Sequence, residues 1–125
     1  MADIIGGMYS YLDPERASDF ATDPAQMLNL AETFVSSLKK DLQMLTQVLT
    51  DQDVVQLRRQ LHTLKGYVTF LCTENLGQEL IALEAASRDK DFAQLAPSVQ
   101  AVVPMLQTLL SEVEHWHTHV LQSQA

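Results

Sequence analysis

The residues of this chain best suited to chemistry lie in residues 57–71, where His62 is followed by Lys65 and Gly66. Positions three and four apart on a helix are neighbours, so the lysine and the glycine would flank the imidazole. A neutral imidazole is a competent nucleophile, and the ammonium of Lys65 would place a positive charge beside it. Glycine inside a helix costs about 1 kcal/mol relative to alanine, which suggests that a side chain here would obstruct a partner.

The same segment predicts the helix that positions these groups. Its apolar residues recur at spacings of four and three, typical of a helix buried along one side: Leu57, Leu61, Leu64, Val68 and Leu71. At about 100° per residue, His62 points about 140° from this stripe, and Lys65 lies on its shoulder. The residues that share the outward side with His62 are Arg58, Arg59, Gly66 and Thr69. Phe70 points outward on the other side of the stripe and is a candidate for partner contact.

A long helix is predicted before this segment. Asp23 and Pro24 are typical of an N-cap and a first helical residue. The apolar residues that follow, at spacings of three and four, are Leu28, Ala31, Val35, Leu38, Leu42, Leu45 and Leu49. Residues 51–53 supply a turn and a cap, so the helix of His62 should run from about residue 53 to 71.

Two more one-sided helices are predicted after it. Thr73 can cap a third helix with the stripe Leu76, Leu80 and Leu83, which fades near residues 88–91. The stripe of the fourth comprises Val99, Val102, Leu106, Leu109, Val113, Trp116 and Val120. Pro97 fits a first turn, and Pro104 should kink this helix because it removes a hydrogen bond.

Four one-sided helices joined by short connections predict an all-α fold, an antiparallel four-helix bundle over residues 23–121. Residues 1–22 are less regular and predict an appended arm or short helix. Gly6 and Gly7 interrupt a small apolar set there, and Asp13 followed by Pro14 marks a turn or a short helix start.

Glu84 is the candidate partner of the histidine. If the chain reverses near residues 72–74, the two helices run antiparallel. His62 then lies at the same height along the helix pair as Glu84, and Lys65 at the same height as Ile81. Glu84 would lie about 80° around its own helix from the apolar stripe, at the edge of the buried side, where it can face the neighbouring helix. A carboxylate that binds one imidazole nitrogen would leave the other as the free nucleophile. The alternative is that Glu84 is a solvated shoulder residue.

Composition argues against several classes of partner. The chain has 125 residues and a net charge of −8, which argues against nucleic acid or an anionic membrane as the main partner. No apolar run approaches the roughly 18 residues of a membrane span. Cys72 is the single cysteine, which is consistent with a reducing compartment. We therefore expect a soluble, cytoplasmic monomer of one domain, with a local basic patch around His62.

These residues carry a resemblance. The run His62-Thr63-Leu64-Lys65-Gly66, with residues 57–61 before it and Leu76, Leu83, Glu84 and residues 88–91 after it, resembles the histidine-containing phosphotransfer (HPt) domain of phosphorelays. The resemblance covers about residues 24–115. It implies that His62 is the phosphorylated histidine, that Lys65 is its electrostatic partner and that Gly66 leaves room for a receiver domain. The position of Glu84 often carries a polar side chain in that family.

The resemblance also implies partners and chemistry. We expect His62 to accept a phosphoryl group from a receiver-domain aspartate or a sensor or hybrid histidine kinase, and to pass it to a response regulator. The chain would have no autonomous kinase activity and no cofactor, since Mg²⁺ would be held by the partner receiver domain. Partner contacts are expected from the outward residues Arg58, Arg59, Gly66, Thr69 and Phe70.

The sequence differs from the family pattern in two places, and it is also consistent with other classes of function. Tyr67 replaces a small residue usual in the family and could alter which partners fit, and Cys72-Thr73 replaces a small pair. The chain could instead be an adaptor of the same fold that passes no phosphate, a structural bundle, or an enzyme with an unrecognised site. His115 and His119 have the i, i+4 spacing of a metal-binding pair, with His117 between them, but no clear third ligand accompanies them.

Overall fold

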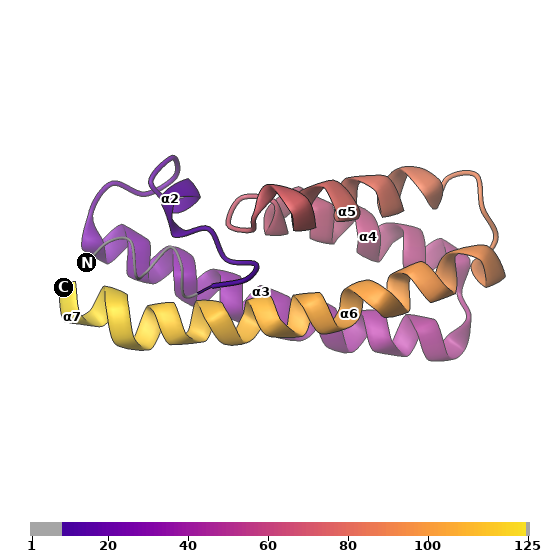
Figure 1. Ribbon diagram of the computed structural model, residues 1–125. Coiled ribbons are helices and arrows are strands. Elements are labelled where there is room, and N and C mark those ends of the chain that lie inside the picture. Colours follow the sequence, from indigo (N-terminus) through magenta and orange to yellow (C-terminus); the bar gives the residue numbers. More distant parts are fainter. Residues whose placement is uncertain (1–8, 125) are drawn as a thin grey trace.

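The computed structural model describes residues 9–124 as a bundle of antiparallel helices (Figure 1). Its main helices are α3 (Pro24–Asp51), α4 (Val54–Val68), α5 (Glu74–Ala86) and α6 (Phe92–His115). A short helix α2 (Pro14–Ala17) precedes them, and α6 continues into a π-helix η1 (Trp116–Leu121) and α7 (Gln122–Gln124). No strand is present between residues 9 and 124. The predicted all-α bundle is confirmed.

Aspartates begin most of these helices. Asp23, Asp53 and Asp91 each accept a hydrogen bond from the backbone N–H three residues on, which satisfies a group that the helix itself leaves unpaired. Asp13 caps α2 in a similar way. Thr73 does occupy the N-cap position of α5, but its side chain makes no cap hydrogen bond. The predicted cap is therefore right in position and wrong in mechanism.

Several predicted boundaries and stripe positions are corrected. Helix α4 ends at Val68 and not near residue 71, although Leu71 is buried as expected. Pro97 is the sixth residue of α6, beyond the first turn, because the capping box of Asp91 starts the helix earlier. At the other end, Leu121 is buried in place of Val120. The π-helix has more residues per turn, so the buried position after Trp116 comes five residues later.

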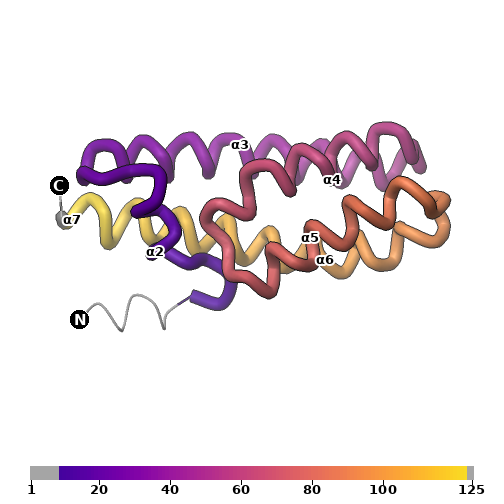
Figure 2. The backbone as a smooth tube through the Cα atoms, turned by 90° about the horizontal axis from the view of Figure 1, so that it is seen from above, coloured from indigo at the N-terminus to yellow at the C-terminus, as the bar shows by residue number. Residues whose placement is uncertain are grey.

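Different helix lengths leave a gap that the N-terminal residues fill. With 28 and 24 residues against 15 and 13, α3 and α6 extend well beyond α4 and α5. Residues 9–22 lie over this end of the long pair, beside the α4–α5 turn (Figure 2). Leu12 and Ala17 are fully part of the hydrophobic core. We call residues 9–22 the arm; the prediction for Gly6 and Gly7 lies outside the described residues.

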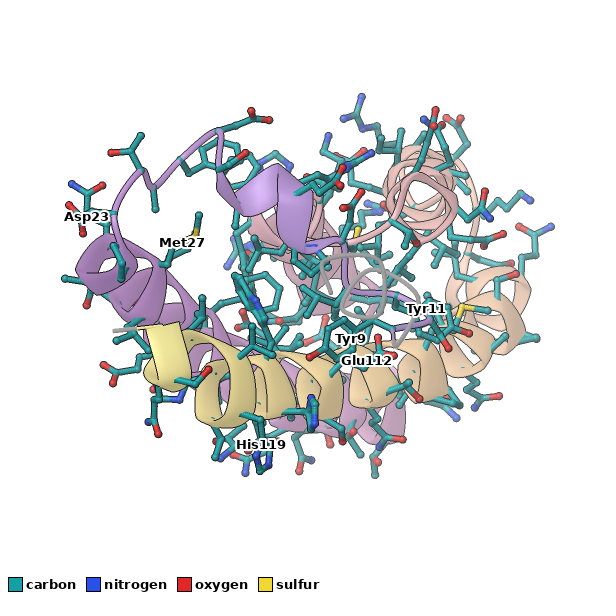
Figure 3. All side chains as sticks on the ribbon, turned by 60° about the vertical axis from the view of Figure 1, so that its left-hand side comes forward. Tyr9, Tyr11, Asp23, Met27, Glu112 and His119 are labelled. Carbon is teal, nitrogen blue, oxygen red and sulfur yellow. The ribbon has the colours of Figure 1, made fainter. Side chains whose placement is uncertain are left out.

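Hydrogen bonds join the arm to the α4–α5 turn and to α6. Backbone hydrogen bonds of 2.8 Å join Asp13 N–H to the Leu71 carbonyl and Thr73 N–H to the Tyr11 carbonyl. On α6, the Glu112 carboxylate accepts hydrogen bonds from three successive backbone N–H groups, those of residues 10–12 (Figure 3). The Tyr9 hydroxyl lies 2.8 Å from His115 Nδ1. Within residues 9–124, no helix has the length and apolar character needed to cross a membrane.

Candidate functional site

Helix α4 presents His62 to solvent. The five stripe residues predicted for this segment are all fully buried, which rotates the opposite side of the helix outward. The side chain of His62 is 73% exposed. Packing of the stripe therefore turns His62 toward solvent.

A buried carboxylate lies beside this exposed ring. Glu84 on α5 has a side chain only 7% exposed, and its Oε1 is 3.3 Å from His62 Nδ1. Because a carboxylate accepts, this contact favours, for the neutral ring, the tautomer that carries its proton on Nδ1 and keeps a lone pair on Nε2. The structure thus brings His62 and Glu84 together, and Glu84 is not the solvated residue that the alternative described.

Two cations also contact this carboxylate. Arg88 Nη2 lies 2.7 Å and 3.0 Å from the two oxygens of Glu84, and Lys65 Nζ lies 3.7 Å from Oε1. The hydrogen bond from Arg88 is the main cause that lowers the pKa of Glu84, opposed by burial and assisted by His62 and Lys65. The same pair raises the pKa of Arg88. Glu84 is therefore ionised and stays an acceptor near neutral pH.

A second set of hydrogen bonds holds the end of α5 against α4. Arg58 Nε donates to the Ser87 carbonyl, and the Ser87 hydroxyl donates to the Glu84 carbonyl at 2.6 Å. Together these side chains surround a shallow hollow next to the imidazole, lined by Arg58, Arg59, His62, Thr63, Glu84, Ser87 and Arg88. Most of its charged groups are cations, which makes the hollow suited to an anionic group.

Gly66 lies one turn from His62 on the same exposed side. A Cβ atom built on Gly66 would meet no atom within 4 Å, apart from its own helix backbone and chain neighbours. Close helix packing therefore does not require a glycine here. The space above Gly66 is open to a partner that approaches the imidazole.

The other residues predicted to contact a partner differ in how exposed they are. Arg59 is exposed, whereas Thr69 is half-buried and its hydroxyl donates to the Lys65 carbonyl at 2.8 Å. Phe70 is exposed and stacks on Phe20 of the arm. The structure therefore places Arg59 and Phe70 on the surface, while Thr69 mainly closes the end of α4.

Tyr67 points away from this surface. Its hydroxyl donates to Asp41 on α3 at 2.7 Å, and its ring packs edge-on against Phe34. Burial, followed by this hydrogen bond, raises the pKa of Tyr67. The prediction that Tyr67 alters partner fit is not supported by its position, because the contact pairs α3 with α4 on the inner side of the helix. Cys72 is buried as well, and burial raises its pKa to about 11.

Arg88 is a site residue that was not predicted from the sequence. Glu84 and Arg88 have the i, i+4 spacing at which a helical carboxylate and guanidinium meet, so this pair was detectable. No sequence spacing pointed to Ser87, because its carbonyl is bound by Arg58, which belongs to another helix.

The C-terminal histidines form no three-ligand cluster. His115 and His119 have ring centroids 4.6 Å apart, while His117 Nε2 is 3.3 Å from Glu32 Oε1 on α3. Among the described residues, no three His, Cys, Asp or Glu side chains are grouped closely enough to hold a metal ion. The helical segment that carries them extends to Gln124.

Comparison with known families gives a match that includes this site. The family model of the Hpt domain matches residues 29–116, which span α3 to the start of η1 and contain His62, Glu84 and Arg88. Comparison with curated proteins and with solved structures gave no match. The matched region exceeds half of the chain, and the helical fold agrees with it. The chain belongs to the Hpt domain family, whose members carry phosphoryl groups in two-component signalling.

Proposed function

We propose that His62 accepts a phosphoryl group from a receiver-domain aspartate or a histidine kinase and passes it to a response regulator. The observation that carries this proposal is the contact of His62 Nδ1 with the buried Glu84, on a ring that is 73% exposed. Hpt domains interact with receiver domains and histidine kinases in phosphorelays. The proposal assigns that role to one nitrogen of one histidine.

In the proposed reaction, the lone pair of Nε2 attacks the phosphorus of an aspartyl phosphate. The new N–P bond forms as the P–O bond to the aspartate breaks, and the aspartate leaves as a carboxylate. The ring retains its proton on Nδ1, and the positive charge that develops on the imidazole is offset by Glu84. No proton has to leave the histidine during the step.

Lys65 and Arg88 supply the remaining positive charge at the site. Each lies near Glu84, and Arg88 also lines the hollow where the phosphoryl oxygens would arrive. Phosphoryl transfer needs mainly positioning and charge neutralisation from the protein. In this proposal the partner receiver domain holds Mg²⁺, and the chain itself contributes the nucleophile, Glu84 and the cations.

A two-step transfer assay tests the proposal. A receiver domain labelled on its aspartate with ³²P is mixed with the chain, and a second, unlabelled receiver domain is then added. Label should move to the chain and then onward, and His62→Gln should block both steps while its helical content is unchanged. Binding of receiver domains without any transfer of label would instead support the adaptor hypothesis.

A further inference from the structure

Two aromatic rings from distant parts of the chain stack on the surface. Phe20 of the arm and Phe70, in the turn after α4, have ring centroids 4.6 Å apart and ring planes inclined by 28°. They remain 53% and 44% exposed. Exposed apolar side chains are common singly, whereas this stacked pair forms one continuous apolar patch.

The arm holds Phe20 in this position. Ala17 and Ala21, on either side of Phe20 in the chain, are buried. Arg16 of α2 donates a hydrogen bond to the Thr69 carbonyl at 3.2 Å, next to Phe70. The ring of Phe20 is therefore directed outward by anchored neighbours, and binding a partner there would require little further ordering.

A hollow borders the aromatic pair. It lies between the arm and the first turns of α3 and is lined by Phe20, Ala21, Gln26, Asn29, Leu30 and Thr33. An exposed aromatic centre with amide and hydroxyl groups beside it has the composition of a protein–protein contact, in which polar groups surround an apolar core.

The patch lies close to the imidazole. Phe70 follows His62 by eight residues and lies two residues beyond the end of α4; eight residues of helix span about 12 Å. A standard interface covers about 800 Å² on each partner, which corresponds to a disc of radius about 16 Å. A receiver domain centred on His62 would therefore cover Phe70 and reach the arm.

We propose that Phe20 and Phe70 together form an apolar anchor for the receiver domain that exchanges phosphate with His62. The inference rests on the proposed function and extends it, since it makes the arm part of the binding surface. The matching partner surface has an acidic phosphorylation pocket, which faces Arg58, Lys65 and Arg88, beside an apolar patch that accepts the two rings.

The experiment compares two phosphate donors on three proteins. The first donor is phosphoramidate, a small molecule that needs no docking surface; the second is a receiver domain phosphorylated on its aspartate. The proteins are wild type, Phe20→Ala and the matched control His119→Ala. His119 is also an exposed ring close to a neighbouring ring, with its centroid 4.6 Å from that of His115 and the planes inclined by 40°, but it lies beyond α6 on the side away from α2 (Figure 3).

With the receiver domain, Phe20→Ala should raise the half-saturating donor concentration about tenfold, as expected for loss of an interface anchor, while His119→Ala matches wild type. With phosphoramidate, all three should be labelled on His62 at the same rate. Equal receiver kinetics for the two variants would overturn the anchor and leave the proposed function intact. Failure of wild type to accept label on His62 from either donor would instead overturn the proposed function.

Discussion

Arg88, two residues beyond the end of α5, binds both carboxylate oxygens of Glu84, at 2.7 Å and 3.0 Å. The guanidinium is largely exposed and the carboxylate is buried, so one solvent-facing cation holds an ionised group inside the protein. Since Glu84 in turn contacts His62, Arg88 is a positioning residue for the imidazole.

This pair predicts a dependence of stability on pH. The folded-state pKa of Glu84 lies below its ordinary value of 4.5, so its stabilising contribution is present above about pH 4.5 and is lost as the pH falls through the lowered pKa. Arg88→Ala should raise that pKa and lower the melting temperature at pH 7. Adding Glu84→Gln should restore part of the loss, because no unpaired charge then remains buried. A melting temperature that does not change in Arg88→Ala at pH 7 would contradict this role.

Phosphate is expected on His62 and on no other histidine. The product should be a phosphoramidate, which is lost in acid and retained in base. His62→Gln should abolish the label, while His115→Gln and His117→Gln should retain it, because those rings contact Tyr9 and Glu32 at another part of the bundle. Label that survives acid treatment, or that persists without His62, would disprove the assignment.

Removing the ammonium of Lys65 should slow transfer without unfolding the protein. The side chain of Lys65 is 30% exposed and off the buried stripe, and Glu84 also binds Arg88, a contact that does not involve the lysine. Lys65→Ala should lose roughly tenfold in transfer rate, equivalent to about 1.4 kcal/mol in the barrier. Lys65→Arg, which keeps the charge, is the control. Equal rates for wild type and Lys65→Ala would show that the lysine is incidental.

Gly66 is expected to serve access and not stability. Because a Cβ atom there would contact nothing, Gly66→Ala should keep or raise the melting temperature, with a gain of up to about 1 kcal/mol in helix propensity. Gly66→Gln should reduce transfer from a receiver domain while helical content, measured by circular dichroism, stays constant. A Gln variant that is destabilised yet transfers normally per folded molecule would defeat this interpretation.

Glu112 should control how firmly the arm covers Cys72. Leu12 pairs with Cys72 through a backbone bridge, and Glu112 binds the N–H groups of residues 10–12. Each charge-assisted hydrogen bond contributes about 1.5 kcal/mol, so losing even one of the three should raise local opening about tenfold. Glu112→Ala should therefore speed the reaction of the Cys72 thiol with a maleimide by about tenfold or more.

The control for this experiment is Glu114→Ala. Glu114 lies two residues further along α6 and makes an exposed ion pair with Lys39 at 3.3 Å, which contributes little to stability. Its thiol reactivity should equal that of wild type. Equal reactivity in Glu112→Ala would show that the carboxylate is not what holds the arm.

Local periodicity was sufficient to predict the helices and the direction of His62. Apolar spacings of three and four define which side of a helix is buried wherever the helix packs, so the stripe from Leu57 to Leu71 already placed the imidazole outward. The pairing of Asp23 with Pro24 located the start of α3 for a similarly local reason, since a cap involves only adjacent residues.

Only the tertiary structure decided three further features: the burial of Glu84, the inward direction of Tyr67 and the placement of the arm. Periodicity gives the direction of a side chain on its own helix, but its surroundings depend on the height and rotation of the neighbouring helix. Glu84 is buried because α4 covers its shoulder, and Tyr67 finds Asp41 because α3 runs beside it. The arm joins the core because α4 and α5 are too short to cover α3 and α6, a mismatch that exists only once the four helices are packed together.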